Sequence, residues 1–345
     1  MTINNRDFTV GKLKYKLLIR MLENFVSDLA IHDKRVLIGS KIGEDAAVID
    51  IGDKYLIAKT DPITFATDEI GYYAVNVNVN DIVCMGAVPK WFQSSILLPE
   101  NHTTIGLIEK IFKSIHDTCK SMGISVIGGH TEITLGLERP IVVGSLLGEV
   151  EKEKLVLTSG AEPGDALILT KGIFIEGTSI IGREKEKMLL EKDFSLDFIK
   201  KCKNYLYDPG ISVFKEALIA NQNFHIKSMH DPTEGGLACG IAEMTVASNT
   251  GVLIDEKKIN ILPEPLKLSK IFNLNPLSTI SSGSLLIAVE QKYSSELIDL
   301  LKNNKIHAKK IGEFLSKEEG LKIKHGDGKI RPLKYSENDE ITKIF

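Results

Sequence analysis

Short apolar runs of strand length alternate with longer amphipathic segments along most of the chain, and this alternation most restricts the possible folds. Residues 36–38, 46–49 and 54–59 have strand character and follow one another closely, whereas residues 70–85 and 104–122 show the apolar spacing of helices. The pattern predicts an α/β or α+β protein. The closely spaced early strands argue against a single Rossmann unit, in which a helix follows each strand.

A polar segment interrupts this alternation near the middle of the 345 residues. Residues 152–154 and 159–165 are rich in charged and turn-forming side chains, and a second series of strands and helices starts at residue 166. Chains of this length usually form about two domains. We therefore predict one domain over residues 1–155 and a second over residues 156–345.

Charge and cysteine content exclude several classes of protein. The chain has 43 basic and 46 acidic residues, a net charge of −3 that gives no general attraction for nucleic acid or anionic membranes. Its four cysteines, at positions 84, 119, 202 and 239, lack the spacing of zinc fingers or a disulfide framework. Residues 1–20 have no signal-peptide core, and no window has the ~18 consecutive apolar residues of a membrane helix. We expect a cytoplasmic protein that binds neither nucleic acid nor membranes.

Four polar segments in the first half place carboxylate, amide or imidazole groups beside small residues, at the expected ends of strands and helices. They are GEDAA at 43–47, TDP at 60–62, NVND at 78–81 and GGHTE at 128–132. Carboxylates in such turns suit Mg²⁺ bound to a polyphosphate, and paired glycines let backbone N–H groups approach anionic oxygens. Each segment alone is also typical of simple backbone capping. Four of them in one domain favour a shared site.

A further dense polar cluster, HDPTEGG at 230–236, opens a predicted helix. Its amides and the helix dipole suit an anion, although Asp231 or Thr233 also fits a plain N-cap. The chain has neither a P-loop motif nor a GxGxxG motif after a strand, which disfavours P-loop NTPases and dinucleotide enzymes.

Taken in order, these segments resemble those of the PurM-like superfamily of ATP-dependent enzymes. Its members include aminoimidazole ribonucleotide (AIR) synthetase, selenophosphate synthetase, thiamine-monophosphate kinase and the hydrogenase maturation protein HypE. The resemblance spans roughly residues 11–290 and includes NDI at 80–82, MGAVP at 85–89 and SGSLLIAV at 282–289. HypE and the AIR synthase-related proteins are the most similar members.

The resemblance implies a fold and a set of ligands. The N-terminal β-rich domains of two chains would pair into a barrel, each followed by a C-terminal α/β domain, so a homodimer is expected. ATP and Mg²⁺ are the implied cofactors, with Mg²⁺ held by Asp45, Asp61 and Asp81. The residues implied to contact the nucleotide are Asp45, Asp61, Asn80, Asp81, Gly128, Gly129 and Thr131.

Four residues are the candidates for catalysis: His130, Glu132, Asp231 and Glu234. Asp231 and Glu234 would face the cleft from the second domain. His130 would touch the phosphates or act as an acid or base, although a histidine at this position also fits a simple carbonyl cap. Lys12 fits a contact with the nucleotide about as well as it fits an exposed surface.

Three departures separate the chain from the HypE pattern. HypE carries a C-terminal Cys that receives a carbamoyl group, whereas the last Cys here is Cys239. GHTE at 129–132 stands where HypE has GDTK, and SSG at 281–283 stands where HypE has NEG. The resemblance therefore implies the shared ATP-dependent chemistry rather than dehydration of a group on the protein's own tail.

The implied function is ATP- and Mg²⁺-dependent activation of a carbonyl or amide oxygen by phosphorylation. The substrate is an unidentified small or protein-borne molecule, with hydrogenase or metal-centre maturation as the candidate setting and a maturation-complex protein as a candidate partner. Two alternatives stay open. One is a non-catalytic ATP-binding scaffold, and the other is a small-molecule kinase like thiamine-monophosphate kinase.

Overall fold

The computed structural model describes residues 13, 15–26, 29, 32–39, 44–64, 66–336 and 338–345. Lys12 and Gly43, two positions singled out in the sequence, lie outside these residues. Among the described residues, no helix has both the length and the apolar character needed to cross a bilayer.

Six strands form the N-terminal sheet, in the order β1-β2-β3-β6-β4-β5. Neighbouring strands are antiparallel except β4 and β5, which are parallel and joined through a helix. The strands are β1 (Val36–Ile38), β2 (Ala47–Asp50), β3 (Lys54–Ile63), β4 (Val88–Pro99), β5 (Ser125–Thr134) and β6 (Ile141–Glu151). β5 is therefore one edge of this sheet, and β3 lies three strands away from it.

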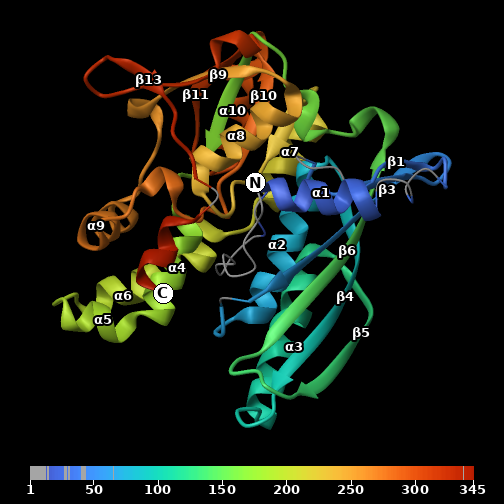
Figure 1. Ribbon diagram of the computed structural model, residues 1–345, viewed down its shortest axis with the longest axis vertical. Coiled ribbons are helices and arrows are strands. Elements are labelled where there is room, and N and C mark those ends of the chain that lie inside the picture. Colours follow the sequence, from blue (N-terminus) through green and yellow to red (C-terminus); the bar gives the residue numbers. More distant parts are fainter. Residues whose placement is uncertain are drawn as a thin grey trace.

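Helices α2 (Ile70–Cys84) and α3 (Ile105–Met122) belong to this half, with α1 (Tyr15–Phe25) preceding it. α2 packs on β3, β6 and β4, and α3 packs on α2 (Figure 1). α3 begins after Thr104, whose side chain accepts a hydrogen bond from Leu107 N–H, and it ends at Gly123 with φ +69°. Nearly every side chain of α2 is buried, including its asparagines. The polar groups of α2 therefore need partners inside the protein.

Seven strands form the second sheet, in the order β13-β12-β9-β11-β7-β10-β8. They are β7 (Asp165–Thr170), β8 (Ser228–His230), β9 (Gly251–Asp255), β10 (Leu286–Glu290), β11 (Ala308–Leu315), β12 (Leu321–Lys324) and β13 (Ile330–Pro332). The helices of this half are α4 (Ile175–Glu184), α5 (Glu186–Glu191), α6 (Leu196–Asn204), α7 (Phe214–Asn223), α8 (Gly236–Ser248), α9 (Pro263–Phe272) and α10 (Ser294–Asn303).

One hydrophobic core runs through both halves. It joins Ile82 of α2, and Met85 directly after this helix, to Val156 and to Ala217 and Ala220 of α7. α2 also contacts β8, so its C-terminal turn lies where the two halves meet. The predicted boundary at residue 155 falls between β6 and β7 and stays a prediction as a domain division.

The long helices and most strands match the sequence prediction, and Asn80 and Asp81 lie near the C-terminal end of α2, inside the helix predicted over residues 70–85. Two predicted turns were wrong, because Asp61 lies inside β3 and residues 128–132 lie inside β5. The physical reason is that β3 and β5 continue through glycine and proline positions. Pro62 pairs with Val143 of β6 within this ladder. An added Cβ at Gly129 would come within 2.2 Å of Ser94 O, so the strand needs a glycine at this position. Gly235, rather than Asp231 or Thr233, precedes the first turn of α8.

Candidate functional site

Four aspartates from distant parts of the sequence converge where the two halves meet, and we call them the acidic cluster. Asp45 precedes β2, Asp61 lies in β3, Asp81 lies in the last turn of α2, and Asp231 directly follows β8. The Lys59 Nζ atom lies 3.3 Å from Asp61 Oδ2 and 3.0 Å from Asp81 Oδ2. Ligand-capable oxygens of Asp45 and Asp231 lie within 4.8 Å of each other. The cluster therefore draws on both domains predicted from the sequence.

His230 holds Asp45 in place. Its Nδ1 atom lies 3.0 Å from Asp45 Oδ1, and its Nε2 atom lies 2.9 Å from Glu243 Oε2 on α8. The hydroxyl of Thr158 donates a second hydrogen bond to Asp45, at 3.3 Å. A ring that bridges two carboxylates has a fixed orientation, so Asp45 is pinned from the second half of the chain.

The protonation states reflect an excess of carboxylates. Burial raises the pKa of Asp81 well above its usual value, against the opposing effect of Lys59. Burial and the facing Asp45 raise the pKa of Asp231 to about 7. Burial also acts to raise the pKa of Asp45, but the charge and hydrogen bond of His230, together with Lys59 and Thr158, outweigh it and the pKa is lowered. Among the described residues, Lys59 and His230 are the cations that face these four carboxyls, so the cluster favours a further cation.

Two asparagines of α2 fix the geometry around the cluster. The side chain of Asn78 accepts a hydrogen bond from Asp61 N–H at 3.0 Å and donates to Asp61 O at 3.4 Å. Asn80 accepts from Val213 N–H and donates to Ile211 O, both at 2.9 Å. Both amide atoms of Asn80 are thus bonded to backbone of the second half, so in this structure Asn80 positions α2. Its predicted contact with the nucleotide stays a prediction.

The Gly-Gly-His segment lies at the same level as Asp61 but at the far edge of the sheet. Asp61 pairs with Gly144 of β6, Gly144 with Ser94 of β4, and Ser94 with Gly129 of β5. Three strand spacings of about 4.8 Å separate the two positions, roughly 14 Å in all. Within one chain, therefore, Gly128, Gly129 and the residues after them do not join the acidic cluster.

The candidate catalytic pair on β5 faces solvent. His130 Nε2 lies 3.0 Å from Glu132 Oε2, and the two side chains are 66% and 47% exposed. The hydroxyl of Thr134 donates to Glu132, and the hydrogen bonds from His130 and Thr134 lower the pKa of Glu132. Thr131 lies on the opposite face of the strand, because successive side chains alternate. The roles predicted for these residues stay predictions.

Two family models match the chain. One, described as AIR synthase related protein, N-terminal domain, covers residues 43–150, and the other, AIR synthase related protein, C-terminal domain, covers residues 162–324. The chain belongs to the AIR synthase related family.

The names of its relatives describe several different activities. A putative hydrogenase expression/formation protein of Methanocaldococcus jannaschii is 29% identical over 88% of this chain and 90% of its own length. A selenide, water dikinase of the same organism is 24% identical over 90% of each chain. The carbamoyl dehydratase HypE of Rhizobium leguminosarum is 25% identical over 79% of this chain and 75% of its own.

This AIR synthase related chain has a PurM-like fold, which its similarity to solved structures shows. HypE in complex with ATP matches with a TM-score of 0.71 and 18% identity over 98% of both chains. A ThiL protein complexed with AMPPCP and TMP also has a TM-score of 0.71, with 21% identity over 95% of this chain and 98% of its own. The HypE of a HypE–HypF complex has a TM-score of 0.72, with 20% identity over 92% and 99%. At these identities the likeness concerns the fold.

In this AIR synthase related chain, sequence reasoning missed four residues at the cluster: Lys59, His230, Glu243 and Cys84. The spacing of residues in the sequence could have indicated two of them. Lys59 precedes Asp61 by two residues, which places both side chains on one face of a strand. Cys84 follows Asp81 by three residues, which places both on one face of a helix. Cys84 is fully buried, and its Sγ atom lies 3.8 Å from Asp231 Oδ1.

Glu234, the fourth candidate for catalysis, follows Asp231 by three residues in the loop between β8 and α8. Its charge acts on Glu176 and on Asp339. Glu176 lies in the first turn of α4 and is almost fully buried. Asp339 accepts a 2.7 Å hydrogen bond from Gly235 N–H, at the start of α8. The loop thus faces the acidic cluster with Asp231 and a second carboxylate group with Glu234.

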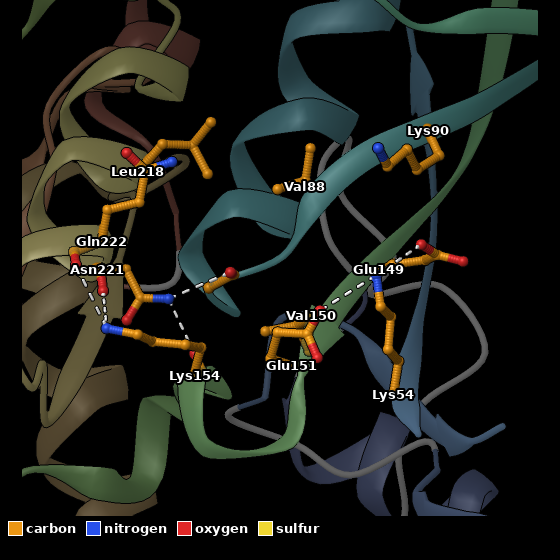
Figure 2. A pocket seen from close by; sticks show the side chains of 11 residues that line it. Lys54, Val88, Lys90, Glu149, Val150, Glu151, Lys154, Leu218, Asn221 and Gln222 are labelled. Carbon is orange, nitrogen blue, oxygen red and sulfur yellow. Dashed lines mark hydrogen bonds and ion pairs between the residues drawn. The ribbon is translucent and has the colours of Figure 1, made fainter. Parts of the chain in front are cut away.

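A cavity of about 210 Å³ lies at another place, between β4, β6 and α7 (Figure 2). Its polar lining is largely bonded within itself. Lys154 donates to the backbone oxygens of Asn221 and Gln222, and Lys54 pairs with Glu149 and Glu151. None of the four aspartates lines this cavity, so the cavity and the acidic cluster are separate places.

Proposed function

We propose that the protein is an ATP- and Mg²⁺-dependent enzyme that activates a carbonyl or amide oxygen by phosphorylating it. The observation that carries the proposal is the convergence of four aspartates, from both halves of the chain, around one lysine and one histidine. Phosphoryl transfer depends mainly on positioning and on neutralising the charge of the phosphates. A buried, carboxylate-rich site held by fixed partners suits that task.

The donor set fits Mg²⁺. This ion prefers carboxylate and phosphate oxygens and keeps some of its waters. Asp45, Asp61, Asp81 and Asp231 supply the carboxylates, and the Oδ2 atom of Asp231 is buried and accepts no hydrogen bond from the described residues. When bound, Mg²⁺ would neutralise phosphate charge. Lys59 would hold the carboxylates of Asp61 and Asp81 in place, and His230 would keep Asp45 ionised.

A homodimer is part of the proposal. β5 is an edge strand whose residues are exposed on both faces, including Val126, Ile127 and Ile133 at 52–53% exposure. Unprotected apolar edge strands are usually covered in native proteins. Pairing of β5 with a second copy would bury this edge and bring His130 and Glu132 next to that copy. The roles proposed for these two residues depend on such an arrangement.

The variants Asp45→Asn and Asp81→Asn test the site directly. We expect each to weaken Mg²⁺–ATP binding at least about tenfold, and to abolish ATP turnover, because each removes a charged ligand. Calorimetry and phosphate release would measure these effects. Asp117→Asn is the matched control, since it removes an exposed aspartate that also pairs with a lysine. Cluster variants that bind and turn over ATP like the wild type would contradict the assignment.

The fate of the γ-phosphate separates the enzyme from its alternatives. A small-molecule kinase is the second candidate, because the fold matches the ThiL complex as well as it matches HypE. With labelled ATP, the activation chemistry would release inorganic phosphate in the presence of substrate, whereas a kinase would leave the label on a small acceptor. Tight ATP binding without ADP formation would favour a non-catalytic scaffold. The HypE–HypF complex supports testing maturation proteins of that kind as partners.

A further inference from the structure

We infer that Cys84, Asp45 and Asp231 form a site for a thiophilic divalent cation of the zinc class, which competes there with Mg²⁺. The inference deepens the proposed function, because two of the ligands belong to the acidic cluster. Sγ of Cys84 and one oxygen from each aspartate lie within 4.8 Å of one another. A thiolate ligand favours softer metal ions such as Zn²⁺, whereas carboxylates alone suit Mg²⁺.

The distances are close to those of a metal site. Zinc binds sulfur at about 2.3 Å and carboxylate oxygen at about 2.0–2.2 Å, so ligand atoms around a tetrahedral ion lie roughly 3.3–3.7 Å apart. Cys84 Sγ and Asp231 Oδ1 are 3.8 Å apart. No pair of these ligand atoms has to close by more than about 1 Å to reach the ideal spacing. Three protein ligands and one open position are the arrangement of catalytic zinc sites.

The unpaired oxygen of Asp231 is the independent observation that points to a ligand. Asp231 is 2% exposed, and its Oδ2 atom accepts no hydrogen bond from the described residues. Buried carboxylate oxygens normally have a partner. The Cys84 thiol donates only to the other oxygen. A cation next to both groups satisfies the carboxylate and replaces the thiol proton.

The surroundings hold the ligands as outer-shell partners do in metal sites. His230 and Thr158 bind Asp45, and Glu243 binds the far side of the His230 ring. Cys84 is placed by α2, whose register is fixed by Asn80. The side chains of Asp45 and His230 retain 9% and 10% exposure, so a cation enters from their side. The fourth ligand of such an ion would be a water molecule or a phosphate oxygen of the nucleotide.

Co²⁺ is the probe, because a cobalt–thiolate bond gives a charge-transfer absorption in the near ultraviolet that oxygen ligands do not give. The full-length, reduced protein is titrated with Co²⁺ in excess Mg²⁺. We expect one equivalent to produce the band, Zn²⁺ to remove it, and a further hundredfold excess of Mg²⁺ to leave it. Cys84→Ser should abolish the band, and Asp231→Asn should weaken Co²⁺ binding at least tenfold. Cys119→Ser is the matched control, a buried cysteine of α3 with no carboxylate ligand in the set, and should keep the band.

The outcomes separate this inference from the proposed function. If the wild type shows no thiolate band while Mg²⁺–ATP binding still depends on Asp81, the cysteine site is wrong and the nucleotide site stands. If the band appears and depends on Cys84, while ATP binding does not depend on Asp81, the metal site stands and the proposed function fails. A band that survives in Cys84→Ser overturns the inference, because another thiol then binds the metal.

Discussion

Glu176 is an acidic residue whose side chain is almost completely buried. It lies in the first turn of α4, and its Oε2 atom is buried and accepts no hydrogen bond from the described residues. Ser282 donates to the carboxyl, but burial dominates and raises the pKa of Glu176 to about 8, with the charge of Glu234 adding to the shift. Glu176 therefore carries a proton at neutral pH, next to the loop of Asp231.

This shift makes stability depend on pH. Folded Glu176 keeps its proton up to about pH 8, whereas the unfolded chain loses it near the ordinary value of 4.5. Its contribution to the free energy of unfolding is therefore full below that ordinary value and is lost as the pH rises through about 8. Glu176→Gln should remove this dependence, which we expect to be about 2 kcal/mol between pH 6.5 and 8.5.

Urea unfolding of wild type and Glu176→Gln at pH 6.5, 7.5 and 8.5 measures the difference between the two slopes. Glu191→Gln, at an exposed position in the neighbouring helix α5, is the control and should keep the wild-type slope. Equal slopes for the wild type and Glu176→Gln would show that Glu176 is ionised in the folded protein.

At the scale of elements, α2 joins the two halves of the molecule. It is buried on nearly every side, and its two central asparagines bond to backbone that is distant in sequence. Asp81 and Cys84 follow within the same helix, so the position of α2 sets the position of both. Helix register, rather than a flexible loop, determines the geometry of the acidic cluster.

Asn80→Ala tests this role of α2. The change leaves Ile211 O and Val213 N–H without their buried partner, and each unsatisfied group costs about 1–3 kcal/mol. We expect the free energy of unfolding to fall by about 2–4 kcal/mol and Mg²⁺–ATP to bind more weakly, because Asp81 shifts with the helix. Asn223→Ala removes only an exposed bond within α7 and should change both quantities little. A stable Asn80→Ala protein with intact binding would contradict the role of α2.

Sequence patterns predicted helices and strands better than they predicted contacts. Apolar spacing located α2 and α3, because a buried face leaves that spacing in the sequence. It did not show that Lys59 lies between Asp61 and Asp81, because that depends on how α2 packs on β3. The glycines at 128 and 129 predicted a turn, but the close approach of β4 also requires a glycine at position 129, within a strand. The sequence places His230 next to Asp231, yet the contact of His230 with Asp45 depends on how two distant parts of the chain meet.

At the scale of the whole molecule, one hydrophobic cluster extends over both halves, and the two sheets end in different kinds of edge strand. β5 ends the N-terminal sheet with apolar side chains exposed on both faces, whereas β13 ends the second sheet as a short strand of three residues. Long apolar edges promote association, and short edges resist it. The proposed dimer therefore uses β5.

Ile133→Glu should convert the dimer to a monomer, because a charge on each copy would be buried without a partner. Ile330→Glu on β13 is the matched control, since Ile330 is 54% exposed and Ile133 is 53% exposed. Light scattering coupled to size-exclusion chromatography gives the mass of each variant. A wild-type monomer, or a dimer that is unaffected by Ile133→Glu and lost in Ile330→Glu, would overturn the assignment of β5.

The Mg²⁺ dependence of ATP binding tests the central claim most directly. Buried carboxylates repel a bare polyphosphate, whereas a bridging cation reverses the sign of the interaction. In calorimetric titrations of the full-length protein, we expect ATP with Mg²⁺ to bind at one site per chain and ATP with a chelator to bind at least about a hundredfold more weakly, a difference of about 2.7 kcal/mol. Equal ATP affinity with and without Mg²⁺ would contradict the acidic cluster as the nucleotide site.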